Sequence, residues 1–290
     1  MTERAPSEGL RLPEPIEIAR LEERRQAFGV GEIAHAAEPA MGGTLCAGEP
    51  GSWLNMARGI GLDAPVTEAE VDRLVSFYRD RGMEPTAEIC PFVDGSLLEG
   101  LASRGFLLRA FATCWASDCA GGTLSPVNGW ASGVRFEVLD TGDRSAVEEW
   151  VRVSNSGFVE PEDDPDGPGN MAKIDAMRRV ALHPRVVCVG AYVGDELAGA
   201  GAMEVASPTG GDQVAGLFAA SVLEPFRGRG IQQGLICERL RIAHERGASV
   251  ACIESKPGIA TERNARRLGF QPAYTKATLN QPGAGLVPSL

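Results

Sequence analysis

The chain has 290 residues, of which 43% are hydrophobic and 23% charged, and its formal net charge is −11. Because single domains most often have about 100–150 residues, this length predicts two domains. The negative charge argues against a nucleic-acid partner, since binding to phosphates depends on clustered Lys and Arg.

No segment is expected to enter a membrane. Residues 1–18 lack the apolar stretch of a leader peptide, and no later apolar run approaches the roughly 20 residues of a membrane helix. We therefore expect a cytoplasmic protein.

The cysteines form no CxxC pair and mostly stand in apolar surroundings, which indicates buried free thiols. They are Cys46, Cys90, Cys114, Cys119, Cys188, Cys237 and Cys252.

The first half contains a predicted helix–strand–helix unit. Thr67 is followed three residues later by Glu70, a capping-box spacing that starts a helix. The segment 86–92 (TAEICPF) is a predicted strand, and 95–103 (GSLLEGLAS) is a predicted helix.

The second half alternates strands and helices in a longer series. The apolar runs on either side of Gly194-Asp195 predict a β-hairpin, and the helix before Gly247 is predicted to end at that glycine. In chain order we expect strand 134–139, helix 141–155, helix 170–181, strands 185–193, 196–205 and 214–223, helix 231–246, strand 249–255, helix 261–268 and strand 271–279.

The two halves share a helix, strand, helix order, and glycines end the helices at similar positions. Gly82 precedes Gly105-Phe106 by nearly the same interval that separates Gly247 from Gly269-Phe270. This favours two copies of one α/β (α+β) fold. The turn-forming segment 126–129 is the natural linker, so the predicted domains are 1–128 and 129–290.

The segment 224–236 (EPFRGRGIQQGLI) predicts a phosphate-binding loop. It follows a strand and opens a helix, whose first turn offers unpaired N–H groups and the positive end of the helix dipole. Gly228 and Gly230 allow the positive backbone angles of an anion-binding nest. The loop lacks the Lys and hydroxyl of a P-loop, and its third glycine comes one residue too late for a dinucleotide fold.

The loop resembles the R/Q-x-x-G-x-G/A signature of the GNAT superfamily, over about residues 131–280. The resemblance implies two GNAT-like domains, each with a mixed, mostly antiparallel central sheet flanked by helices. It also implies transfer of an acyl group, usually acetyl, from acetyl-CoA to an amine. Gln232 departs from the pattern, because the family usually has Gly or Ala there.

By this resemblance, backbone groups at Val222 and Glu224 pair with the pantetheine arm, and residues 227–233 hold the pyrophosphate. Gly258, Thr261 and Asn264 flank the arm's other side. For Asn264, a solvated helix residue is the alternative. The implied coenzyme residues are Val222, Leu223, Glu224, Arg227, Gly228, Arg229, Gly230, Ile231, Gln232, Gln233 and Asn264.

Amide formation from a thioester needs a base for the amine and an acid for the leaving thiolate. Many GNAT enzymes place a Tyr acid four residues before the Gly-Phe stop, where this chain has Ala265. Tyr274 is the nearest substitute, and a packed strand aromatic is its alternative role. Glu254 is the candidate base, with an Arg-paired carboxylate as the alternative. The three scattered histidines give no metal-ligand spacing, so no metal is predicted.

The expected acceptor is a primary amine on a small molecule or peptide, and a homodimer is compatible with such a domain. The acidic stretch 160–166 is either a solvated loop or an attractor for a cationic amine. The first copy has the acidic segment 63–68 (DAPVTE) at the place of the phosphate loop, so we expect it to be degenerate and to wall the acceptor pocket. Two alternatives remain open: a non-catalytic acyl-CoA sensor or scaffold, and a transferase for a longer acyl donor.

Overall fold

The computed structural model describes residues 12–119, 124–159, 164, 166–208 and 210–288. The α-helices are α1 (Pro15–Ile33), α2 (Glu68–Arg79), α3 (Gly95–Ser103), α4 (Arg144–Asn155), α5 (Pro168–Leu182), α6 (Ile231–Glu245) and α7 (Ala260–Arg267), and a 3-10 turn, η1, spans Glu224–Phe226. The strands are β1 (Ala36–Ala40), β2 (Gly43–Ala47), β3 (Met56–Arg58), β4 (Thr86–Ile89), β5 (Leu107–Asp118), β6 (Val134–Val138), β7 (Val186–Val193), β8 (Glu196–Ala206), β9 (Val214–Val222), β10 (Val250–Ser255) and β11 (Gln271–Asn280). Every element predicted from sequence forms, whereas α1, β1 to β3 and β5 were not predicted.

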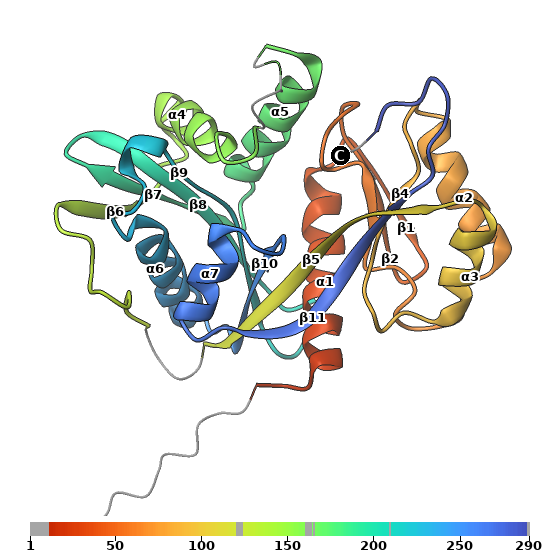
Figure 1. Ribbon diagram of the computed structural model, residues 1–290, viewed down its shortest axis with the longest axis horizontal. Coiled ribbons are helices and arrows are strands. Elements are labelled where there is room, and N and C mark those ends of the chain that lie inside the picture. Colours follow the sequence, from red (N-terminus) through yellow and green to blue (C-terminus); the bar gives the residue numbers. More distant parts are fainter. Residues whose placement is uncertain (1–11, 120–123, 160–163, 165, 209, 289–290) are drawn as a thin grey trace, which may run out of the picture.

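One mixed sheet runs through the molecule in the order β1-β2-β3-β4-β11-β5-β10-β9-β8-β7-β6. The last strand of each half is exchanged: β5 lies between β10 and β11, and β11 lies between β4 and β5 (Figure 1). The mixed sheet flanked by helices confirms the predicted fold class. The predicted boundary at 128/129 falls in the connection between β5 and β6, but the sheet is continuous across the two halves.

The two halves are related by a pseudo-two-fold axis at the pair Ala112–Lys276, where β5 and β11 run antiparallel. The unit α2-β4-α3-β5 corresponds in element order to α6-β10-α7-β11. Glu254 pairs with Cys114 across β10 and β5, and Glu88 pairs with Thr278 across β4 and β11. Because Cys114 and Thr278 each lie two residues beyond the central pair, Glu254 and Glu88 occupy equivalent positions.

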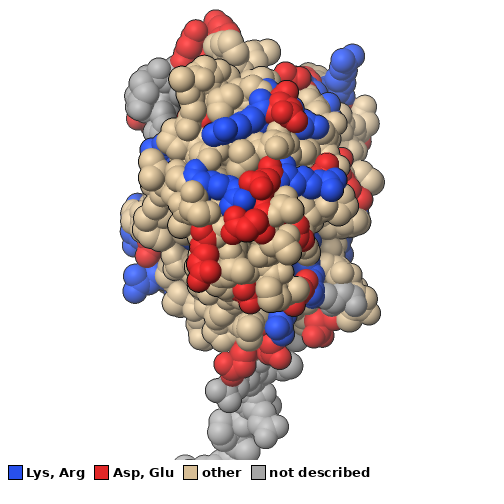
Figure 2. Space-filling view, turned by 90° about the vertical axis from the view of Figure 1, so that its right-hand side faces the viewer, with Lys and Arg blue, Asp and Glu red and all other residues tan. Residues whose placement is uncertain are grey.

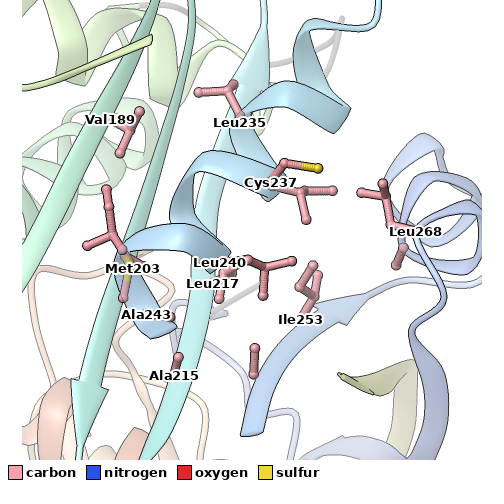
Figure 3. Packing of buried hydrophobic residues seen from close by; sticks show 14 of the residues in the cluster. Val189, Met203, Ala215, Leu217, Leu235, Cys237, Leu240, Ala243, Ile253 and Leu268 are labelled. Atoms are coloured by element: carbon pink, nitrogen blue, oxygen red, sulfur yellow. The ribbon is translucent and has the colours of Figure 1, made fainter. Parts of the chain in front are cut away.

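Helix α6 packs its apolar side on the sheet of the second half. Leu235 and Leu240 contact residues of β8, β9 and β10, and Leu268 at the end of α7 closes the same core (Figure 3). Gly234 is required at its place because a Cβ there would lie 2.2 Å from Cζ of the Phe136 ring. Helices α4 and α5 cover the opposite face around the buried Trp150.

Helix α1 belongs to the first half but lies against strands of both halves, on the sheet face opposite α6 and α7. Pro15 opens it, with a capping box between Glu14 and Glu17. Arg25 reaches β9, where a Cβ on Gly216 would lie 2.2 Å from its guanidinium carbon, and it bonds Glu204 at 3.0 Å. The first half is therefore held to the second by buried polar contacts.

On the face formed by α2 and α3, side chains of both signs stand next to one another (Figure 2). Arg104 pairs there with Glu68 and Asp72, each at 2.6 Å.

All seven cysteines are buried and free, as predicted. No helix in the described ranges is long and apolar enough to cross a membrane.

Candidate functional site

The candidate site begins where β9 and β10 stop pairing. These parallel strands are in register from Val214–Val250 to Leu217–Ile253, and the recorded register ends there. Just beyond, Ala219 has a φ of 53°, a conformation that is costly for a residue with a Cβ. Ser154 on α4 stabilises this irregularity by donating to the Ala219 carbonyl at 2.8 Å. The bulge thus turns the backbone of β9 at the opening between the strands.

The predicted phosphate loop lies at the end of β9 and leads into α6. Gly228 and Gly230 have φ values of 78° and 80°, and nothing lies within 4 Å of a Cβ built on either. Gly230 is the N-cap of α6 and carries no side chain to cap it, while the first helical bond runs from the Gly234 amide to the Gly230 carbonyl. The amides of Ile231, Gln232 and Gln233 are therefore open to an anion.

The two loop arginines are exposed and bond to nearby backbone carbonyls. Arg227 Nε donates to the Val222 carbonyl at 3.1 Å, and Arg229 Nη2 donates to the Pro225 carbonyl at 3.4 Å. The Leu223 amide donates to the Ala198 carbonyl, so two of the predicted coenzyme residues, Val222 and Leu223, already have protein partners for a backbone group. Both guanidinium groups bracket the loop and add positive charge to it.

The two glutamines in the first turn of α6 connect this helix to α7. Gln232 Nε2 donates to Thr261 Oγ1 at 3.0 Å, and Asn264 Nδ2 donates to Gln232 Oε1 at 2.6 Å. Gln233 Nε2 donates to Asn264 Oδ1 at 3.2 Å. The large side chain at position 232 is thus engaged with α7. Asn264 is placed beside the loop, as predicted, but bonded to α6.

Glu254, the predicted base, lies on β10 one residue past the end of the β9–β10 register. Its side chain is 23% exposed, and it accepts from Gln26 Nε2 at 2.5 Å and from Lys276 Nζ. Burial and the nearby Glu88 carboxylate raise the pKa of Glu254, against the charge of Lys276. A carboxylate with a raised pKa at the mouth of the strand opening is suited to accept a proton.

Tyr274, the predicted acid, lies in the same row of the sheet as Glu254, because Cys114 on β5 pairs with both. It is 6% exposed, and its hydroxyl donates to Glu23 Oε1 at 2.7 Å. Burial raises the pKa of Tyr274 well above its usual range. Its assignment as the acid stays a prediction.

Lys276 joins three carboxylates beneath α1. Its Nζ lies 3.2 Å from Glu23, 2.8 Å from Glu88, and in contact with Glu254. Arg58 adds a second cation, 2.7 Å from Glu88. Although burial opposes ionisation, Lys276 and Arg58 hold the pKa of Glu88 at about 2.

This cluster was missed in the sequence because α1, which supplies Glu23 and Gln26, was not predicted. One signal was present. Alternate residues of the last strand, from Tyr274 through Lys276 to Thr278, are polar or polar-tipped, and they line the face that α1 covers. Arg58 lies on the short strand β3, which has no sequence pattern of its own.

The first copy presents no open helix end at the equivalent place. Thr67 caps α2 by accepting from the Glu70 amide at 3.3 Å, and Glu70 bonds back to the Thr67 amide at 2.8 Å. Asp63 in the same connection pairs with Arg24 at 2.6 Å. The first turn of α2 is thus closed by the protein's own acidic and hydroxyl groups.

Of the acidic stretch 160–166, only Asp164 and Asp166 are described, and the remainder lies outside the described residues. In the described ranges, no three His, Cys, Asp or Glu residues are grouped so that they could hold a metal ion.

No family model and no curated protein matches the sequence. The structure is similar to a GCN5-related N-acetyltransferase from Kribbella flavida, with 18% identity and a TM-score of 0.68 over 94% of this chain and 98% of that one. It is also similar to a tandem GNAT protein from the clavulanic acid biosynthesis pathway, with 16% identity and a TM-score of 0.51 over 74% and 69%. A third, a GNAT-family protein described as a putative acetyltransferase from Novosphingobium aromaticivorans, has 15% identity and a TM-score of 0.51 over 93% and 100%.

Proposed function

The chain has the GNAT acetyltransferase fold in tandem, and from this premise we propose that it is an acyl-CoA-dependent N-acyltransferase. The donor is acetyl-CoA and the acceptor a primary amine of a small molecule or peptide. The coenzyme is held in the second copy alone, at the loop from Glu224 to Gln233.

One observation carries this proposal: the uncapped start of α6 and the carboxylate of Glu254 both lie beyond the point where β9 and β10 stop pairing. Gly228 and Gly230 leave open space where a Cβ would stand, and the α6 amides are free of a side-chain cap. The donor set is therefore suited to a pyrophosphate, with added charge from Arg227 and Arg229. The equivalent end of α2 is filled by Thr67 and Glu70.

The chain's own residues supply the proton chemistry. Glu254 accepts a proton from the acceptor's ammonium group, which leaves a neutral amine for direct attack on the thioester carbonyl. Gln26 and Lys276 fix the carboxylate by donating to it. The N–H groups of the irregular β9 backbone near Ala219 are the candidates to stabilise the developing oxyanion.

A non-catalytic acyl-CoA sensor is the second candidate function. It is favoured by Ala265, which is fully buried and stands where the family's tyrosine acid is expected, and by the Tyr274 hydroxyl, which is already donated to Glu23. Release of free thiol in the presence of an amine separates the two functions. A longer acyl donor is a variant of the first function and is tested by the same assay with other thioesters.

The coenzyme site is tested by the double variant Arg227→Glu, Arg229→Glu. Reversing both charges next to a dianion should weaken acetyl-CoA binding at least about tenfold at low salt. The fold should persist, because both side chains are exposed and each bonds to the carbonyl of a residue four or five positions earlier in the chain. Isothermal titration calorimetry measures the affinity, with Arg266→Glu, an exposed arginine at the far end of α7, as the matched control. Unchanged affinity in the double variant would remove the loop as the coenzyme site.

A further inference from the structure

The buried charges beneath α1 do not balance if every group is ionised. Lys276 and Arg58 carry two positive charges, whereas Glu23, Glu88 and Glu254 would carry three negative charges. The neighbouring buried carboxylates Glu22 and Glu204 have cations of their own, Arg25 and Arg185, and Arg185 also pairs with the more exposed Glu32. One proton on a carboxylate of the first set would make it neutral.

Glu88 is the carboxylate least suited to hold that proton. It is the one that contacts both cations, Arg58 at 2.7 Å and Lys276 at 2.8 Å. Glu23 is fully buried, its Oε1 accepts from Tyr274 and contacts Lys276, and its Oε2 has no hydrogen-bond partner. A buried ionised carboxylate with an unpartnered oxygen is costly, whereas a neutral carboxyl needs fewer donors.

Glu23 and Glu254 share one partner atom, Lys276 Nζ. Oε1 of each contacts Lys276 Nζ, so the two carboxyl groups depend on one ammonium for their neutralisation, and ionisation of either raises the cost of ionising the other. We infer that Glu23 is a positioning residue that shares one proton with Glu254 across Lys276, so that helix α1 of the first copy sets the charge of the base in the second. This inference rests on the proposed function for its role in catalysis.

The productive form has the proton on Glu23 and the charge on Glu254. One N–H bond of the acceptor ammonium breaks and one O–H bond forms on Glu254, which leaves the amine neutral and both carboxyls protonated. Loss of one proton to solvent restores the pair, which matches the single proton released when an ammonium becomes an amide. No electron transfer is involved.

Burial raises the pKa of Glu23 to about 7 against the charge of Lys276, and it also raises the pKa of Glu254. Both shifts follow the geometry above. The titratable and charged groups that face the pair are Glu22 on α1, Arg58 on β3, Glu88 on β4, Cys90 after β4, Cys114 on β5, and Tyr274 and Lys276 on β11.

The test is an infrared pH titration of the full-length protein, which detects protonated carboxyls without requiring activity. In the wild type we expect one buried protonated carboxyl at pH 6 that disappears around pH 7. Glu23→Gln and Glu254→Gln should each abolish it, because removing either partner lets the other ionise. Glu204→Gln, a buried carboxylate that does not contact Lys276, should retain it. A wild type without this signal, or a signal that persists in Glu254→Gln, would overturn the shared proton even if Glu23→Gln does not fold.

The pH profile of kcat/KM gives the catalytic readout. Glu23→Gln keeps a neutral group beside Glu254 at every pH, as the proton on Glu23 does in the productive form. The change in kcat/KM that the wild type shows around pH 7, where the shared proton is lost, should therefore be absent in this variant. A change around pH 7 that persists in a folded, active Glu23→Gln would reject the inference and keep the proposed function. A protein that shows the infrared signal but transfers no acyl group would reject the proposed function and keep the shared proton.

Discussion

Glu88 and Glu254 show how neighbours decide what a carboxylate does. They occupy equivalent positions about the pseudo-two-fold axis, and both contact Lys276, one member of the central pair. Glu88 has Arg58 as a second cation, and its pKa is held at about 2. Glu254 has the neutral Gln26 instead, and its pKa is raised. Glu88 is thus a permanent counter-ion, whereas Glu254 can take up and release a proton.

The raised pKa of Glu23 predicts a stability that falls with rising pH. Its folded pKa of about 7 exceeds the ordinary value of 4.5, so its contribution is fully present below pH 4.5 and is lost as the pH rises through 7. For a shift of this size the loss is on the order of 3 kcal/mol. Urea unfolding at pH 5 and pH 8 measures it, and Glu23→Gln should reduce the difference. A difference that Glu23→Gln leaves intact would assign the pH dependence to other groups.

Helices α2 and α6 stand at equivalent places in the two copies but begin differently. Thr67 and Glu70 close the start of α2 with a reciprocal capping box, whereas Gly230 leaves the start of α6 open. A capping box satisfies the amides that would otherwise bind an anion. The contrast at this one turn explains why we place a single coenzyme site in a protein with two copies of the fold.

Gly230→Ala tests the open turn. A Cβ at φ 80° costs about 1–2 kcal/mol and moves the amides at the start of α6, so acetyl-CoA binding should weaken about tenfold. Gly105→Ala is the matched control, because Gly105 has φ 75° and equally open surroundings but lies away from the loop. Thermal unfolding should shift similarly in both variants, while calorimetry should show weaker binding only in Gly230→Ala. Equal affinities would indicate that the α6 amides do not bind the coenzyme.

The regular elements of the second half were predictable, because each has a clear period and an end signal such as Gly194-Asp195 or Gly247. Helix α1 was not, since its buried face carries Glu22, Glu23 and Arg25 where apolar residues would reveal a helix. The loop could be found from its glycines and arginines. The partners of Glu254 could not, because Gln26 and Lys276 are 228 and 22 residues away in sequence and meet it only through the fold.

At the scale of the whole molecule, the two copies complete one another. β5 of the first half pairs with β10 and β11, and β11 of the second half pairs with β4 and β5. Helix α1 then covers this exchange with the buried charges of Glu23 and Arg25. Neither the exchange nor its consequence for the site follows from the repeat in the sequence, because strand order depends on contacts between distant segments.

The exchange predicts that neither half folds alone. The fragment 129–290 would lack the strand between β10 and β11, and 1–128 would lack the strand between β4 and β5. Each fragment produced separately should show poorly dispersed amide NMR signals, whereas the two produced together should form a 1:1 complex that binds acetyl-CoA. A well-folded 129–290 fragment that binds acetyl-CoA alone would show that the second copy is independent.

Catalysis at this site is tested most directly by thiol release from acetyl-CoA with a panel of primary amines. The wild type, Glu254→Gln and Glu88→Gln are compared at a pH where Glu254 is ionised. We predict release with at least one amine. Glu254→Gln should lower kcat about 10²- to 10⁴-fold while retaining acetyl-CoA binding, and Glu88→Gln should keep its activity wherever it folds. Binding of acetyl-CoA without release for any amine, or full activity in Glu254→Gln, would contradict catalysis at this site.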